Sequence, residues 1–155
     1  NGENVRDWLY VEDHARALAL IVERGVPGQA YNIGGRQERR NIDVVREICR
    51  LLDSYAPLRD GSREGLITLV ADRPGHDRRY AIDPSKIERE LGWRAVETFE
   101  TGLAKTVRWY LERRGWWQSI LDAGYRAERI GLASKAEFLQ AGPSRRSQRV
   151  QSTKS

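Results

Sequence analysis

Residues 11–25, VEDHARALALIVERG, carry the clearest structural pattern in the sequence. Apolar side chains recur at spacings of three and four along this stretch, which predicts an amphipathic helix from Val11 to Arg24. Glu12 and Asp13 lie in its first turn, where the helix dipole favours negative charge. Gly25 follows the last basic residue, so we expect a left-handed cap there.

Three further helices and two short strands are expected along the chain. The helices are residues 43–54 capped by Asn41, a short helix opened by Asp83 and Pro84 that stops at Gly92, and a longer one from Thr98 to Gly115. The strands are residues 29–33 and residues 66–70, with a loop over residues 56–65 before the second. Because helices alternate with strands, the predicted fold class is α/β or α+β.

The composition bounds the class of protein. The 155 residues are 39% hydrophobic and 32% charged, which fits one globular domain rather than a disordered chain. No apolar run approaches the roughly 18 residues of a transmembrane helix, so no membrane partner is expected. Cys49 is the only cysteine, which excludes a disulfide framework and a cysteine-based metal cluster. Because the sequence has no methionine and starts Asn-Gly-Glu, we expect a piece of a longer protein.

The net charge of +5 is concentrated near the C-terminus. Residues 134–155 hold five basic side chains and one acidic side chain, which leaves residues 1–133 close to neutral. This segment is rich in Ser, Gln and Arg and poor in apolar residues, so we predict a disordered basic tail over residues 132–155. Such a tail would contact nucleic-acid phosphates without specificity, and a non-catalytic, basic-tailed binding module is therefore one alternative function.

The most informative polar motif covers residues 72–83, DRPGHDRRYAID. Its Pro-Gly pair favours a turn, which would hold Arg73 and His76 together at the end of a predicted strand, where α/β proteins often bind ligands. Arginine presents a planar fork of donors that suits phosphate oxygens. The motif therefore predicts a phosphate or other anion site. The alternative is that Arg73 and His76 pair with Asp72 and Asp77 in the same turn.

Longer blocks of the sequence resemble a known enzyme family. Residues 6–13 and 31–35 are similar to many nucleotide-sugar epimerases and dehydratases, whereas residues 73–83 carry a narrower pattern. That pattern continues in order in residues 90–93, 98–100 and 106–111. On these blocks, residues 1–131 resemble the C-terminal half of the dTDP-glucose 4,6-dehydratase family, an NAD-dependent branch of the extended short-chain dehydrogenases/reductases. A fragment of another nucleotide-sugar epimerase or decarboxylase is the nearest alternative.

The resemblance implies a fold and a division into domains. The fold would be α/β, the C-terminal part of an extended Rossmann-type short-chain dehydrogenase/reductase, mostly its small substrate-binding lobe. Residues 1–35 would be a helix and a strand that return to the dinucleotide-binding domain, whose remainder the sequence lacks, and residues 36–131 would form the substrate-binding lobe. Residues 1–35 would then expose an apolar helix face with no sheet to cover.

The resemblance also implies roles for five residues. Arg6 and Arg73 would hold the pyrophosphate of a dTDP-sugar such as dTDP-glucose, because two arginines can offset about two negative charges bidentately. Asn41 and His76 would contact the same nucleotide-diphosphate end. Tyr125 would line the nucleotide pocket or, equally well, pack as an ordinary aromatic under the terminal helix.

Other parts that the family uses are not in the sequence. It has no glycine-rich NAD-binding motif, no Tyr-x-x-x-Lys pair and no catalytic Asp-Glu pair. We therefore expect no catalytic, NAD-binding or metal-binding residue here, and no activity from this chain alone. The full enzyme would be a cytoplasmic, NAD-dependent homodimer that converts dTDP-glucose to the 4-keto-6-deoxy sugar and water. A stand-alone nucleotide-sugar-binding protein is a further alternative.

The remaining charged residues of the two motifs are expected to be structural. Predicted to form ion pairs and caps are Asp7, Glu12, Asp13, Arg78 and Arg79. His14 lies within the first helix and is expected to be non-catalytic, and Cys49 is expected to be a core or near-core thiol.

Overall fold

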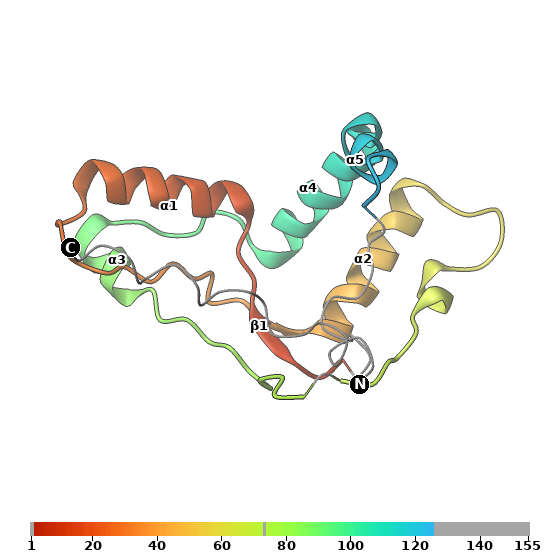
Figure 1. The fold of residues 1–155 in the computed structure, drawn as a ribbon, viewed down its shortest axis with the longest axis horizontal. Coiled ribbons are helices and arrows are strands. Elements are labelled where there is room, and N and C mark those ends of the chain that lie inside the picture. The colour runs from red at the N-terminus through yellow and green to blue at the C-terminus, as the bar shows by residue number, and fades with distance from the viewer. Residues whose placement is uncertain (1, 73, 126–155) are drawn as a thin grey trace, which may run out of the picture. The chain divides into compact units, whose positions relative to one another are not determined.

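The computed structural model describes residues 2–72 and 74–125 (Figure 1). The chain falls into two compact units, residues 1–124 and residues 125–155, and the first holds every helix and strand described here. The expected basic tail, residues 132–155, and the predicted site residue Arg73 lie outside the described residues. Within the described residues, no helix is both long enough and apolar enough to span a bilayer.

The first unit contains five α-helices, a 3-10 turn and a small two-stranded sheet (Figure 1). The helices are α1 (Val11–Arg24), α2 (Asn41–Tyr55), α3 (Ser85–Leu91), α4 (Phe99–Glu112) and α5 (Arg114–Asp122), and the 3-10 turn is η1 (Arg63–Leu66). Strands β1 (Val5–Asp7) and β2 (Glu38–Arg40) pair antiparallel, with Val5 opposite Arg40 and Asp7 opposite Glu38.

Helix α1 confirms the predicted helix, but its predicted cap is wrong. Gly25 has φ −67° and an extended backbone instead of a left-handed one. The left-handed residue is Gly28, with φ 82°, in a turn closed by the Gln29 N–H bond to the Val26 carbonyl at 3.1 Å. Pro27 followed by glycine favours this kind of turn, so the chain reverses three residues later than expected.

The ends of α3 and the start of α4 are close to the prediction. Asp83 accepts the Ser85 N–H at 3.0 Å, but α3 begins at Ser85 with Pro84 as its N-cap, one residue later than predicted. The helix stops before Gly92 as predicted, and Gly92 has φ 69°. Thr98 and Thr101 bond reciprocally at the start of α4 as a capping box.

Two other helix boundaries were wrong. Asn41 is the first residue of α2 and does not cap it, because its N–H bonds the Asn4 carbonyl and β2 leads directly into the helix. The long helix also ends early, at Glu112. Arg113 has φ −106° and ψ 37°, so Gly115 lies inside a separate α5.

Both predicted strands are wrong. Residues 29–33 and 66–70 form no strand, because a strand requires a hydrogen-bonded partner and the described residues provide none beside these segments. Leu66 is 77% exposed, so the second segment is not the buried strand that its apolar run suggested. Strands β1 and β2 were missed because they are only three residues long and mostly charged.

The core of the first unit lies where α1 packs against α3. Its fully buried side chains are Ala17 of α1 and Ile87 of α3, with Trp93 nearly so. Tyr31 and Ile33 pack against this cluster from the irregular segment that was expected to be a strand. Helices α2 and α4 pack together in the same unit, and Cys49 of α2 is half-buried.

A buried carboxylate joins α1 to the segment before α4. Asp13 is 2% exposed and accepts the backbone N–H groups of Val96 at 3.1 Å and Glu97 at 2.9 Å. Its carbonyl accepts the Trp93 indole N–H at 3.2 Å, and Arg16 bonds its carboxylate. The structural role expected for Asp13 is confirmed, because a buried carboxylate requires such partners.

We predict that Asp13→Ala lowers the free energy of unfolding by about 2–4 kcal/mol, because it leaves two backbone N–H groups without an acceptor. Chemical denaturation of the full chain measures this change. The matched control is Glu12→Ala, the exposed neighbour in the same helical turn, which should change the stability little. Equal losses in the two variants would contradict the role given to Asp13.

One face of α1 is apolar and exposed. Val22 is 89% exposed, Val11 69% and Leu18 50%, as expected for a helix face with no sheet to cover. The division of the chain into domains at residue 35 stays a prediction.

We predict that Val22→Lys reduces self-association of the chain, because a charge interrupts the apolar face without removing a buried contact. Light scattering across a concentration series measures this change. Glu23→Lys, which adds a lysine at an exposed neighbouring position, is the control. Equal self-association of Val22→Lys and wild type would contradict the prediction.

Candidate functional site

Strand β1 brings the two polar motifs of the sequence together. The Val5 N–H donates to the Arg78 carbonyl at 2.8 Å, and the Tyr80 N–H donates to the Val5 carbonyl at 3.1 Å. These two bonds form a parallel bridge between Val5 and Arg79, on the opposite edge of β1 from β2. Arg6, the next residue along β1, therefore lies beside the turn that carries His76.

The Arg6 guanidinium is held by hydrogen bonds and by an aromatic ring. Its Nη1 donates to the Val5 carbonyl at 2.6 Å, and its Nη2 donates to the Asp77 carbonyl at 3.0 Å. Nη2 also lies 2.8 Å from Nε2 of His76, and the guanidinium carbon lies 4.3 Å from the centre of the Tyr80 ring. An arginine has five N–H donors, so part of this fork remains for an anion.

The contact with Arg6 determines the tautomer of His76. Arginine is only a donor, so we assign Nε2 as the acceptor and place the ring hydrogen on Nδ1. Nδ1 then donates to Asp72 Oδ1 at 2.6 Å. The alternative that His76 pairs with an aspartate of its own turn is thus observed, and the same ring also contacts Arg6. The predicted contact of His76 with a nucleotide stays a prediction.

Two site residues were not recognised from the sequence. Tyr80 stacks on Arg6 and donates its hydroxyl to the Asp77 carboxylate. Asn4 donates its side-chain N–H to the Asp77 carbonyl at 3.2 Å and accepts the Asn41 N–H at 2.9 Å. Tyr80 lies in the recognised motif, but only the pairing with Val5 shows that it faces Arg6.

Of the other predicted site residues, only Asn41 is linked to the Arg6 cluster by the described contacts. Asn41 is linked to the cluster through Asn4, although its side chain makes no hydrogen bond within residues 2–72 and 74–125. Tyr125 is exposed and belongs to the second unit, so its role stays a prediction. The role of Arg73, outside the described residues, also stays a prediction.

Asp7 closes the glycine turn that follows residue 33. Its carboxylate accepts the backbone N–H groups of Gly35 at 3.0 Å, Arg36 at 3.3 Å and Gln37 at 2.7 Å. A Cβ at Gly35 would lie 2.3 Å from the Trp8 carbonyl oxygen, so no larger residue fits there. The expected capping role of Asp7 is confirmed, and these three N–H groups are not available to a phosphate.

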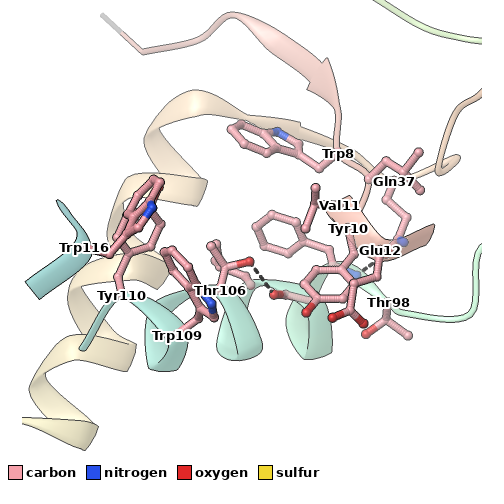
Figure 2. Close-up of a pocket in the computed structure, with 14 residues that line it drawn as sticks. Trp8, Tyr10, Val11, Glu12, Gln37, Thr98, Thr106, Trp109, Tyr110 and Trp116 are labelled. Atoms are coloured by element: carbon pink, nitrogen blue, oxygen red, sulfur yellow. Dashed lines mark hydrogen bonds between the residues drawn. The ribbon is translucent and has the colours of Figure 1, made fainter. Parts of the chain in front are cut away.

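Apart from the Arg6 cluster, the same unit contains a pocket lined by aromatic side chains. It has a volume of about 490 Å³ and lies between residues 8–12 and the helices α4 and α5 (Figure 2). Trp8, Tyr10, Trp109 and Trp116 line it (Figure 2), and the buried Trp8 indole N–H has no hydrogen-bond partner among the described residues. It contains none of the predicted site residues.

An ion pair supports the segment that bridges to β1. Arg79 donates to the Glu38 carboxylate at 2.6 and 2.8 Å, which confirms the structural role expected for Arg79. These hydrogen bonds hold the pKa of Glu38 below its ordinary value of 4.5. Because the folded-state pKa is the lower one, the stabilisation is present above pH 4.5 and is lost as the pH falls through the folded-state pKa.

We predict that Glu38→Gln is less stable than wild type at pH 7, and that the difference shrinks as the pH falls below 4.5 and Glu38 becomes protonated. Chemical denaturation at a series of pH values measures the difference. Glu112→Gln is the control, because Glu112 makes no ion pair among the described residues. A difference that grows on acidification would contradict the prediction.

Known dehydratases are similar to this chain in sequence and in fold. The dTDP-glucose 4,6-dehydratase of Escherichia coli is 61% identical over 135 residues, 85% of this chain and 37% of its own length. The crystal structure of dTDP-glucose 4,6-dehydratase from Bacillus anthracis in complex with NAD matches with a TM-score of 0.66 and 42% identity, over 77% of this chain and 35% of its own. The predicted α/β fold class is therefore confirmed.

Epimerases match less closely. The structure of UDP-glucose 4-epimerase from Thermotoga maritima with UDP-glucose has a TM-score of 0.59 and 28% identity, over 72% of this chain and 33% of its own. A family model described as GDP-mannose 4,6 dehydratase matches residues 1–106. The chain spans about a third of the length of these relatives, and it belongs to the GDP-mannose 4,6 dehydratase family.

Proposed function

We propose that this chain is the C-terminal, substrate-binding part of a dTDP-glucose 4,6-dehydratase, and that Arg6 binds the diphosphate of dTDP-glucose. The 61% identity to a curated dTDP-glucose 4,6-dehydratase supports the substrate, since the UDP-glucose 4-epimerase named above is only 28% identical. The observation that carries the proposal is the fixed guanidinium of Arg6, which is oriented before any ligand binds.

Arg6 would contact the diphosphate of the substrate and not the sugar carbons that react. Energy from contacts with a non-reacting part of the substrate can orient the reacting part. In the complete enzyme, Arg6 would hold the diphosphate while residues outside this sequence carry out the loss of water from dTDP-glucose.

NAD does not fit the glycine turn of this chain. The N–H groups of Gly35, Arg36 and Gln37 already bond the Asp7 carboxylate, so the turn offers no donors to a cofactor phosphate. NAD would therefore bind residues outside this sequence, and the chain alone would be inactive. A cytoplasmic homodimer stays a prediction from the resemblance.

We predict that the chain binds dTDP and that Arg6→Ala weakens binding about 10- to 150-fold, as expected for the loss of ~1.5–3 kcal/mol from a charged hydrogen bond. Isothermal titration calorimetry measures both affinities. Arg24→Ala is the control, because Arg24 lies exposed at the end of α1 and takes no part in this cluster. No binding of wild type at millimolar dTDP would reject the proposed function.

A further inference from the structure

Tyr80 contacts the Arg6 guanidinium directly, yet neither the sequence pattern nor the comparisons assign it a role. We propose that Tyr80 is a positioning residue, whose ring is the platform that orients the Arg6 guanidinium toward the diphosphate. This inference rests on the proposed function. It concerns how the binding group is held and not which ligand it binds.

The ring is placed by the same backbone bonds that place Arg6. The Tyr80 N–H bonds the Val5 carbonyl at 3.1 Å, and Arg6 follows Val5 in β1. Side chains on neighbouring extended segments that face the same way come into contact, and here the guanidinium carbon lies 4.3 Å from the ring centre. A cation this close to an aromatic face is attracted by the electrons of the ring.

The far end of Tyr80 is also tied down. Its hydroxyl donates to the Asp77 carboxylate, and the carbonyl of the same Asp77 accepts from Arg6 Nη2 at 3.0 Å. Asp77 is therefore bonded by both residues, so the ring and the guanidinium are held against one backbone position. An arginine on the surface of a protein otherwise samples many rotamers, and it loses this conformational entropy when it binds an anion in one rotamer.

The ring contact uses none of the guanidinium N–H donors. The hydrogen bonds of these donors go to the carbonyls of Val5 and Asp77 and to His76, and hydrogen bonds to an anion form in the guanidinium plane. Tyr80 is 46% exposed, so the pair lies at the surface where a ligand can reach it. The ring thus restricts the motion of Arg6 without occupying its donors.

Two substitutions separate the ring from the hydroxyl. Tyr80→Leu removes the aromatic ring, and Tyr80→Phe keeps the ring and removes the hydroxyl that bonds the Asp77 carboxylate. The matched control is Tyr55→Leu, since Tyr55 is 37% exposed and also has an arginine, Arg108, over its ring at 5.2 Å, outside the Arg6 cluster. Thermal unfolding of each variant shows whether its fold is retained.

The first measurement uses no ligand. The ring current of Tyr80 should shift the side-chain proton signals of Arg6 in the nuclear magnetic resonance spectrum of the full chain. We expect Tyr80→Phe to keep this shift, Tyr80→Leu to abolish it and Tyr55→Leu to leave it unchanged. Identical Arg6 signals in wild type and Tyr80→Leu would overturn the proposal.

The second measurement compares dTDP with thymidine, which lacks the diphosphate. We expect Tyr80→Leu to weaken dTDP binding roughly fivefold, the effect of losing one exposed cation–ring contact, and Tyr80→Phe to stay within about twofold of wild type. Thymidine binding should not change in either variant. Equal losses for both ligands, together with a lower unfolding temperature, would show a merely structural role and overturn the proposal.

The outcomes separate this inference from the proposed function. If wild type binds dTDP and Tyr80→Leu binds it equally well, the proposed function stands and the role of Tyr80 is rejected. If wild type binds no dTDP, the proposed function is rejected, and with it the role of Tyr80 in binding.

Discussion

The backbone pairing of Val5 is the constraint on which the candidate site depends. Strand β1 is only three residues long, yet it pairs with β2 on one edge and with residues 78–80 on the other. Buried or half-buried backbone groups require partners, so these bonds determine which segments are neighbours. Arg6 meets His76, 70 residues away in sequence, only because of this pairing.

Carboxylates that bond backbone groups hold the segments around the site. Asp7 organises the turn after residue 33, and Asp13 joins α1 to the start of α4. Both lie in the same sequence block as Arg6, and both carboxylates are already satisfied. Arg6 differs because its partners are carbonyls, an imidazole and an aromatic face, which leave its positive charge without a carboxylate partner among the described residues. An arginine held in this way remains available to an anion.

The Arg6 guanidinium is therefore held in one orientation, and its positive charge has no carboxylate partner among the described residues. Several other arginines of the unit are paired with acidic side chains, as Arg40 is with Asp43 and Arg63 with Asp53. Such pairs stabilise the fold modestly and offer little to a ligand. The contrast between Arg6 and these paired arginines supports the proposal that Arg6 binds an anion.

Features that depend on local chemistry were predictable from the sequence. The periodicity of α1, the stop of α3 before Gly92 and the beginning of α4 at Thr98 were predicted, because they depend on residues within a few positions of one another. The left-handed conformation of Gly92 and the capping box of α4 were seen only in the structure. Arg6 and His76 were identified as binding candidates from motifs and resemblance, without knowledge of their geometry.

Strand pairing and side-chain contacts between distant segments became known only from the folded chain. Residues 29–33 and 66–70 have apolar strand patterns but no paired neighbour among the described residues, whereas the charged β1 and β2 do pair. The contact of Tyr80 with Arg6 likewise follows from the bridge to Val5. Helix caps are satisfied within one segment, but a strand or a binding site needs hydrogen bonds from another segment, and a sequence pattern does not specify which segment supplies them.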